Sequence, residues 1–387
     1  MGVSDMGFST DIYLDNAATA RKYPAAIKAE ADFYKEINAN PLRGLYKKSV
    51  QATTGVEAAR KAILALVRAD KSYTVIFSRG TTEAINLVAN GLVKGPDGFG
   101  IIGREAKVIS DIESHHSNIL PWRQRFENYI LSRDLEEDTK GAVVISLTGV
   151  SNVTGEYFGE RIKNMRKRHS KAILGVDGAQ MVGHVDFDIK ALGADFVAFS
   201  GHKFGAPMGV GGLIIKNTLA EKLRPLNFGG EMVDSVAVDG TPTFAEIPER
   251  LEAGTLSAGA IFGLKRAAEL ALDEFEHSGL EREKFYQNIQ SAAAEMRKIE
   301  HVQVLAANGL IITFQIDGVH PHDVAQILAD EGIMVRAGWL CAEPYLRYKG
   351  WGPVVRASFS MLNVNECEKY STFLVEAVRK VRKKMGL

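Results

Sequence analysis

Residues 172–205 read AILGVDGAQMVGHVDFDIKALGADFVAFSGHKFG, a stretch with two apolar runs that each end in polar residues. The first run ends at Asp177 and the second at Ser200. Near-continuous hydrophobicity is typical of strands that are buried on both faces of a parallel sheet. Ligands of open α/β sheets bind beyond the carboxyl ends of such strands. We therefore expect five polar residues to gather at one edge of a sheet: Asp177, Gln180, Ser200, His202 and Lys203.

Similar apolar runs flank this stretch and indicate a larger sheet. Helical patterns lie between them, and in Thr82–Leu92 the apolar residues recur at i, i+3, i+4 and i+7, which makes one apolar stripe. Alternation of strands and helices over about 200 residues predicts a doubly wound, mostly parallel α/β domain. The further predicted strands are Thr74–Phe77, Lys107–Ser110, Ala142–Leu147 and Gly212–Lys216.

The pattern changes after about residue 254 and predicts a smaller α+β domain. A helix is expected between Pro321, at its first turn, and Gly332, and a last helix carries one apolar face near the end of the chain. The other predicted elements are helices Ala258–Phe275 and Glu281–Ile299 and strands Leu310–Ile316, Ile333–Arg336 and Val354–Ser360. We predict a large domain of residues 20–256 and a small domain formed by residues 1–19 and 257–387.

Composition excludes several classes of protein. The 387 residues include 47 Lys and Arg and 47 Asp and Glu, so the formal charge is +0, and neither a strongly basic nucleic-acid binder nor an acidic tail protein is expected. Two cysteines cannot form a disulfide framework or a zinc ribbon, and the low count fits a reducing compartment. No segment reaches the roughly 18 apolar residues of a membrane span, and no signal peptide is recognisable. We expect a cytoplasmic protein without a metal site and without a nucleic-acid or membrane partner.

Asp177 and Lys203 form a pair with a chemical meaning. A lysine that forms an imine needs its pKa lowered from about 10.4, and burial beside other cationic groups lowers it. Cofactor chemistry of this type pairs a Schiff-base lysine with an acid that keeps a pyridinium nitrogen protonated. The small residues of 205–212 would allow a flat ligand to approach closely. Either residue alone would indicate a turn-capping Asp or a surface lysine, whereas the whole set in this order favours a cofactor site.

The motifs VDGAQ and SGHKFG resemble the pyridoxal-phosphate site of the class V aminotransferase family, which has fold type I. More narrowly, the chain resembles cysteine desulfurases of the SufS type and their selenocysteine lyase relatives. The resemblance covers nearly the whole chain and implies a fold type I PLP-dependent transferase. The other motifs in family order are YLDNAATA from Tyr13, FSRGTTEAINLVANGL from Phe77, ESHHSNILPW from Glu113, SNVTG from Ser151, LEAGT from Leu251, RAGWLCAEP from Arg336 and VRASFSMLN from Val355.

The resemblance implies a phosphate site for the cofactor. Thr81 and Thr82 follow a strand and a glycine and open a helix, so their backbone N–H groups and hydroxyls suit an anion. Ser200 and His202 would add donors to the same phosphate. Thr255 resembles a residue that reaches the phosphate of a partner subunit, and this implies a homodimer whose site is complete only in the assembly.

The resemblance also implies contacts to the cofactor ring. Lys203 would form the Schiff base, and Asp177 would hold the pyridine nitrogen in its protonated form. Gln180 would donate to the ring hydroxyl oxygen. His115 matches the imidazole that stacks on the ring, and His116 is a competing choice that the sequence does not separate from it.

The remaining matched positions concern the substrate. Arg356 matches an arginine that binds the substrate carboxylate, for which a planar guanidinium is well shaped. Asn152 would touch the ring or the same carboxylate. Cys341 lies in a loop after a strand and matches the nucleophilic cysteine, whereas Cys367 lies between two acids on the last helix, where a thiolate is disfavoured, and is interpreted as structural.

The resemblance therefore implies a PLP-dependent cysteine desulfurase. It would convert L-cysteine to L-alanine and capture the sulfur as a persulfide on Cys341. The sulfur would pass to an acceptor or scaffold protein, for iron–sulfur cluster assembly or related sulfur metabolism.

Two departures and several alternatives accompany this interpretation. Trp339-Leu340 stands where related chains often carry a histidine pair, and Leu42 stands where they carry the histidine of a His-Arg-Gly sequence. The segment from Cys341 to Arg356 is short, as in the SufS type. The alternatives are a selenocysteine lyase, a class V aminotransferase, lyase or epimerase with a bystander thiol, and a cofactor-binding scaffold without turnover.

Overall fold

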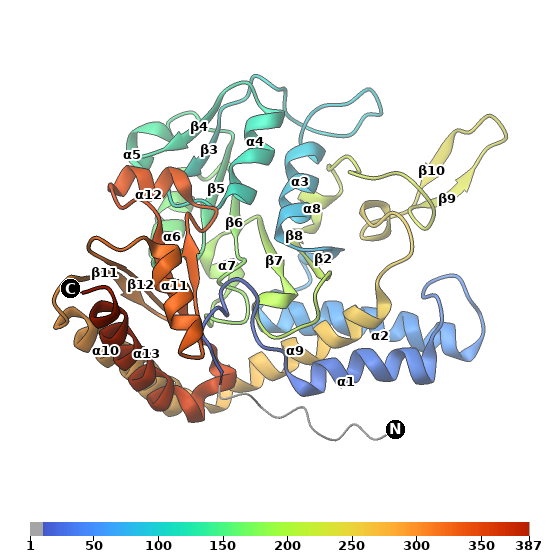
Figure 1. Cartoon of the computed structure of the whole chain (residues 1–387). Helices are drawn as coiled ribbons and strands as arrows, with labels where there is room; N and C mark the ends of the chain where they lie inside the picture. Colours follow the sequence, from blue (N-terminus) through green and yellow to red (C-terminus); the bar gives the residue numbers. More distant parts are fainter. Residues whose placement is uncertain (1–10, 387) are drawn as a thin grey trace. The chain divides into compact units, whose positions relative to one another are not determined.

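The computed structural model describes residues 11–386 and divides into two compact units (Figure 1). The larger unit contains residues 22–151 and 157–277. The smaller unit contains, among the described residues, 11–21, 152–156 and 278–386. The boundary predicted between residues 256 and 257 falls just before helix α9 (Ala258–His277), which packs on helices of the larger unit.

A seven-stranded sheet forms the centre of the larger unit, with the order β2-β8-β7-β6-β5-β3-β4. Strand β8 is antiparallel to both of its neighbours, and every other pairing is parallel, which confirms the mostly parallel α/β prediction. The strands are β2 (Tyr73–Ser78), β8 (Gly211–Lys216), β7 (Phe196–Ser200), β6 (Ile173–Asp177), β5 (Val144–Thr148), β3 (Val108–Asp111) and β4 (Tyr129–Ser132).

Apolar side chains explain why these segments form a central sheet. Every residue of β5 and β7 is buried, as continuous hydrophobic runs predict for strands covered on both faces. Helix α3 (Thr81–Gly91) packs its apolar stripe on β2, β7 and β8 and contacts α4 (Leu120–Arg125). The resulting core includes Ile76, Ile85, Val88, Trp122 and Phe196.

Three helices of the larger unit run side by side (Figure 1). They are α1 (Pro24–Asp32), α2 (Lys47–Leu66) and α9, and α2 also contacts strand β2. A hairpin of β9 (Val233–Val236) and β10 (Pro242–Phe244) projects from this unit (Figure 1). The other helices of this unit are α5 (Leu135–Asp138), α6 (Gly159–Arg168), α7 (Ile189–Leu192) and α8 (Asn217–Ala220).

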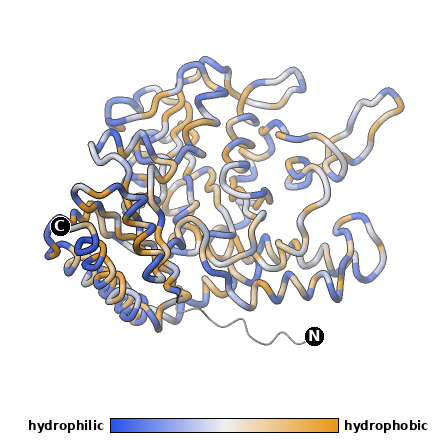
Figure 2. The backbone as a smooth tube through the Cα atoms, in the orientation of Figure 1, coloured by the Kyte–Doolittle hydropathy of each residue, from blue (hydrophilic) through white to orange (hydrophobic). Residues whose placement is uncertain are grey.

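The smaller unit has a four-stranded antiparallel sheet with the order β11-β12-β15-β14. Helices α10 and α13 pack on one another, and in Figure 2 hydrophobic and hydrophilic residues alternate along both. Their apolar faces join a core that includes Phe285, Ile289, Phe314, Leu374 and Val378. The elements are β11 (Val302–Asn308), β12 (Ile311–Ile316), β15 (Val354–Ser358), β14 (Arg336–Gly338), α10 (Gly279–Arg297), α11 (Pro321–Asp330), α12 (Glu343–Lys349), α13 (Cys367–Lys384), and the parallel pair β1 (Ile12–Tyr13) and β13 (Ile333–Met334).

No helix within residues 11–386 combines the length and the apolar composition that a membrane span requires.

Candidate active site

Asp177 and Ser200 are the last residues of the neighbouring parallel strands β6 and β7, so both lie at the carboxyl edge of the large sheet. Asp177 is buried, and its Oδ1 accepts a hydrogen bond from the Ala179 N–H at 3.0 Å. Burial raises the pKa of Asp177, and the Ala179 hydrogen bond and the positive charge of Lys203 oppose that rise. A buried carboxylate with a cation nearby is suited to hold a protonated ring nitrogen.

Hydroxyl groups gather at the start of helix α3. The Thr81 N–H donates to Ser200 Oγ at 2.8 Å, and the two hydroxyls of these residues lie 2.9 Å apart. Thr82 Oγ1 lies 2.7 Å from Ser117 Oγ. Gly80 precedes the helix with a φ of 152°, and a Cβ there would lie 2.8 Å from Ser200 Oγ. A helix N-terminus with four hydroxyls and a required glycine has the donor chemistry that a phosphate needs.

Lys203 lies in a short 3-10 turn, Gly201–Lys203, directly after β7. Two side chains hold the backbone of this turn: Lys22 Nζ donates to the His202 carbonyl and His184 Nε2 to the Lys203 carbonyl, each at 2.9 Å. Gly205 follows with a φ of 91°, and a Cβ there would lie 2.5 Å from the Tyr23 ring. The turn that carries the predicted Schiff-base lysine is therefore held by two side-chain hydrogen bonds and by close packing at Gly205.

Burial and charge keep His202 neutral near pH 7. Burial, with the positive charges of Lys203 and Lys22, lowers the pKa of His202 to about 4. Burial also lowers the pKa of Lys22 to about 8. The sequence analysis did not single out Lys22 or His184, because neither belongs to a motif that it recognised.

His115 caps the short 3-10 helix His116–Asn118 and accepts the Ser117 N–H at Nδ1, at 3.1 Å. This hydrogen bond puts the proton of the neutral imidazole on Nε2. The centroids of the His115 and His116 rings lie 6.1 Å apart, with 48° between the ring planes, so the two rings do not stack on each other. His115 as the ring-stacking residue stays a prediction from the resemblance.

Asp111, which the sequence analysis missed, supports the turn before His115. It is fully buried at the end of β3 and accepts from Ser114 Oγ at 2.7 Å and from the Thr148 N–H and hydroxyl, each at 2.8 Å. Burial, with the nearby Glu113 charge, raises the pKa of Asp111 to about 6. Its position at the carboxyl end of a buried strand was the signal that could have identified it.

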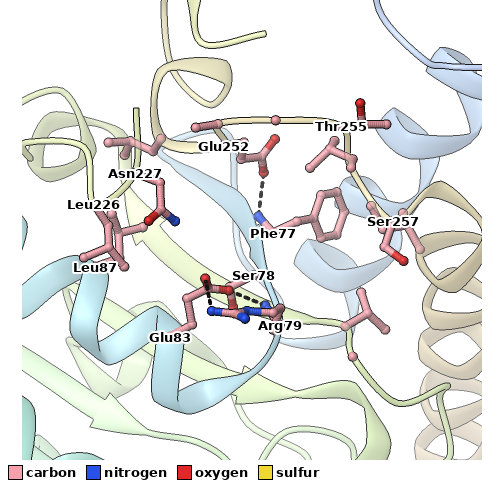
Figure 3. Close-up of a pocket in the computed structure, with 17 residues that line it drawn as sticks. Phe77, Ser78, Arg79, Glu83, Leu87, Leu226, Asn227, Glu252, Thr255 and Ser257 are labelled. Atoms are coloured by element: carbon pink, nitrogen blue, oxygen red, sulfur yellow. Dashed lines mark hydrogen bonds and ion pairs between the residues drawn. The ribbon is translucent and has the colours of Figure 1, made fainter. Parts of the chain in front are cut away.

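Gln180 and Thr255 lie in different surroundings. Gln180 is buried in the turn after β6, whereas Thr255 is exposed. Thr255 lines a cavity of about 280 Å³ together with Arg79 and Glu83 near the start of α3 (Figure 3). Glu252 fixes this loop, because it accepts the Phe77 N–H at 2.5 Å and two hydrogen bonds from Arg60, at 2.8 and 2.6 Å.

In the smaller unit, Arg356 is paired with Arg336 across strands β15 and β14. Like charges at facing positions repel, and Asp15 compensates for both. Asp15 Oδ2 lies 2.7 Å from Arg336 Nη2, and Oδ1 lies 3.3 Å from Arg356 Nη2. The sequence analysis quoted the motif that contains Asp15 but gave the residue no role.

Arg356 is only 3% exposed. Its Nη1 donates to the Asn152 carbonyl at 2.8 Å, while its buried Nε has no hydrogen-bond partner among the described residues. Burial lowers the pKa of Arg356 to about 10, so the group stays charged at neutral pH. A carboxylate ligand could satisfy the remaining donor.

Cys341 is exposed in a turn between β14 and α12. Leu340 and Cys341 have φ angles of 53° and 54°, which cost on the order of 1 kcal/mol for each residue that is not glycine. Asn152 Nδ2 donates to the Leu340 carbonyl at 2.8 Å, and the Ala342 N–H to the Trp339 carbonyl at 2.9 Å.

The two thiols differ in accessibility. Cys367 is buried at the start of α13, and burial raises its pKa to about 11, in line with the structural role expected for it. Cys341 is the exposed thiol. The predicted residues are divided between the two units: the larger unit holds Thr81, Thr82, His115, Asp177, Gln180, Ser200, His202, Lys203 and Thr255, and the smaller unit holds Asn152, Cys341 and Arg356.

The similar proteins described below are all named as cysteine desulfurases. A probable cysteine desulfurase of Halalkalibacterium halodurans is 38% identical over 376 residues, covering 92% of this chain and 90% of the relative. One of Vibrio cholerae is 33% identical over 385 residues, covering 95% and 93%.

Among solved structures, the apo cysteine desulfurase of Thermococcus onnurineus has a TM-score of 0.83 at 32% identity, and it covers 96% of this chain and 95% of that one. The Escherichia coli cysteine desulfurase CsdA, in an S-sulfonic acid form, has a TM-score of 0.82 at 29% identity with the same coverage. The aminotransferase class-V model matches residues 12–367, and the chain therefore belongs to the aminotransferase class-V family.

Proposed function

We propose that this protein is a PLP-dependent cysteine desulfurase that releases L-alanine from L-cysteine and takes the sulfur as a persulfide on Cys341. One observation carries the proposal within this family: an exposed thiol is held in a fixed turn by Asn152, whose carbonyl also binds a buried arginine, Arg356. An aminotransferase needs no such thiol. The names of the relatives support the same activity.

The residues of the larger unit fit the cofactor on which the family depends, pyridoxal 5′-phosphate. Thr81, Thr82 and Ser200 would hold the phosphate at the start of α3, with His202 as a further donor. Asp177 would hold the pyridine nitrogen in its protonated form, Gln180 the ring hydroxyl and His115 the ring face. When bound, PLP supplies an electron sink for the bonds at the substrate Cα.

Lys203 is the proposed base. Its Nζ would hold the cofactor and would serve as the base that moves the proton at the substrate Cα. The His202 carbonyl accepts from Lys22 Nζ, and the positive charge of Lys22 helps to lower the pKa of His202 in the turn that carries Lys203. Arg356 would bind and orient the substrate carboxylate. A contact of Asn152 with the carboxylate or the ring is what the family resemblance implies.

Sulfur transfer requires a thiolate at Cys341. The thiolate forms an S–S bond with the substrate sulfur while the substrate Cβ–S bond breaks. The electron pair of the broken bond stays on Cβ, which takes up one proton to become the methyl group of alanine. The sulfur remains on Cys341 as a persulfide, ready for an acceptor thiol.

Assembly and partners belong to the same proposal. Exposed Thr255 would reach the cofactor phosphate of a second copy, so the working form would be a homodimer. An acceptor or scaffold protein would take the sulfur for iron–sulfur cluster assembly or related sulfur metabolism. The cytoplasmic location stays a prediction from the composition.

A direct test is to incubate the PLP-loaded protein with L-cysteine and determine the mass of the Cys341 peptide. One added sulfur atom, together with alanine in the solution, is the expected result. Formation of a keto acid without alanine, and an unmodified Cys341 peptide, would instead indicate an aminotransferase with a bystander thiol.

A further inference from the structure

Asn152 connects two groups that the proposed reaction uses. Its side-chain Nδ2 donates to the Leu340 carbonyl at 2.8 Å, directly before Cys341. Its own carbonyl accepts from Arg356 Nη1 at 2.8 Å. Asn152 is only 7% exposed, so water competes weakly for either hydrogen bond. One residue thus binds both the turn of the thiol and the buried arginine.

The turn needs such a restraint because its backbone is unusual. Leu340 and Cys341 are consecutive residues with positive φ, a region that residues other than glycine seldom occupy. Conformations of this kind persist only where the surroundings hold them. The Ala342 N–H closes the turn on the Trp339 carbonyl at 2.9 Å, and the Asn152 amide holds the carbonyl between them.

The segment that carries Asn152 is itself fixed to the sheet of the smaller unit. The Val153 carbonyl accepts from Thr313 Oγ1 at 2.5 Å, and the Thr154 carbonyl accepts from Asn308 Nδ2 at 3.0 Å. Gly155 has a φ of 74°, and a Cβ there would lie 2.1 Å from the Asn308 carbonyl oxygen. Asn152 therefore extends from a rigid support, as a positioning group requires.

We propose that Asn152 is a positioning residue for Cys341: its amide fixes the Leu340–Cys341 turn and keeps the thiol in a constant position relative to Arg356. This rests on the proposed function, in which Cys341 takes the sulfur. It differs from the contact to the cofactor ring or the substrate carboxylate that the family resemblance implies for Asn152.

Hydrogen exchange of the PLP-loaded protein tests the contact itself. Asn152→Ala removes the donor, and Asn152→Asp keeps the shape of the side chain but faces the Leu340 carbonyl with an acceptor. Both variants should speed exchange of the Ala342 amide by about five- to tenfold, because one hydrogen bond that restrains the turn is lost. Asn308→Ala is the matched control, since it removes an amide-to-carbonyl hydrogen bond from the same segment at a distance from the turn.

Wild-type exchange at Ala342 in both Asn152 variants would overturn the proposal, as would an equal increase in the Asn308→Ala control. This readout does not depend on turnover. A protein without desulfurase activity would therefore refute the proposed function and still show whether Asn152 holds the turn.

Kinetics separate positioning of the thiol from binding of the substrate. In Asn152→Ala, kcat for alanine formation should fall by at least about tenfold. The KM for cysteine should stay within about twofold, because the backbone carbonyl that binds Arg356 is retained. A large increase in KM with an unchanged kcat would assign Asn152 to substrate binding and contradict the positioning role.

Discussion

The proposed cofactor residues of the larger unit lie at the ends of regular elements, whereas the proposed nucleophile of the smaller unit lies in a turn with two positive φ angles. Asp177 and Ser200 end buried strands, and Thr81 begins a helix of 11 residues. Cys341 instead depends on a side-chain hydrogen bond from Asn152 to keep its turn.

This difference relates to what each group has to do. A cofactor that stays bound gains from buried, preorganised donors, which regular elements provide at little conformational cost. A thiol that receives sulfur and passes it on has to be accessible, and accessible segments with few buried contacts are the ones that open most readily. The comparison predicts that substitutions of the cofactor residues in the larger unit abolish the reaction. Substitutions around Cys341 should instead lower the rate of sulfur transfer, unless they remove the thiol itself.

The largest effect is expected from Lys203→Ala. Without the amine that binds the cofactor and moves the Cα proton, alanine formation from cysteine should fall by at least about a thousandfold. Reduction of the loaded wild-type protein with borohydride should fix the cofactor on the peptide containing Lys203, and the variant should lack this adduct. Lys190→Ala, at an exposed ion pair with Asp70, should keep wild-type turnover. Substantial turnover in Lys203→Ala would contradict the expectation that substitutions among the cofactor residues of the larger unit abolish the reaction.

Cys341→Ala and Cys367→Ala sharpen the contrast between the two thiols. The first should abolish persulfide formation and reduce alanine formation by at least about a hundredfold, with the visible absorbance of the bound cofactor retained. The second should leave turnover unchanged and lower the free energy of unfolding by about 1 kcal/mol, since it removes a buried sulfur. Persulfide in the Cys341→Ala protein would show that another group takes the sulfur.

Much of the large sheet could be predicted because its strands are buried on both faces. The runs that become β6 and β7 were recognised from continuous hydrophobicity alone. Strands β4 and β11 were missed, since both lie at sheet edges and most of their residues are only partly buried. A half-exposed edge strand has a weaker pattern than a central one.

The motifs predicted which residues belong to the candidate site, but they did not predict how the chain supports them. Asp15 binds Arg356 across 341 positions of sequence, a distance over which no local pattern operates. The positive φ angles of Leu340 and Cys341 could not be predicted from the sequence either, because neither residue is a glycine and neither residue type favours that conformation. Long-range pairing and backbone strain are properties of the folded chain.

Asp15→Ala should have the next largest effect in the smaller unit. It leaves the buried Arg356 beside Arg336 without the carboxylate that both contact, and breaking a buried pair of this kind costs about 3 kcal/mol. Urea unfolding measures the loss, and the KM for cysteine should rise as Arg356 loses its orientation. Asp330→Ala, an exposed carboxylate of the same unit, should change stability by less than about 0.5 kcal/mol. Equal losses in the two variants would show that Asp15 adds no specific support.

The last prediction concerns His202 and the dependence of stability on pH. Burial and two nearby lysines lower its pKa to about 4 in the folded protein, against about 6.5 in the unfolded chain. Between these values the unfolded chain binds more protons, so His202 stabilises the fold above about pH 6.5, and this contribution is lost as the pH falls toward 4.

Because the His202 ring is partly exposed, screening reduces the contribution to about 1–2 kcal/mol. His202→Gln should therefore flatten the decline in unfolding free energy between pH 6.5 and 4, measured by urea titrations at a series of pH values. His277→Gln is the control, because that exposed imidazole lies in the same unit and its Nδ1 lies 3.0 Å from Oδ1 of the exposed Asp273. If His202→Gln keeps the full wild-type slope, the imidazole is protonated as easily in the folded protein as in the unfolded chain. The carboxyl edge of the large sheet would then be less buried and less preorganised than the comparison with the Cys341 turn requires.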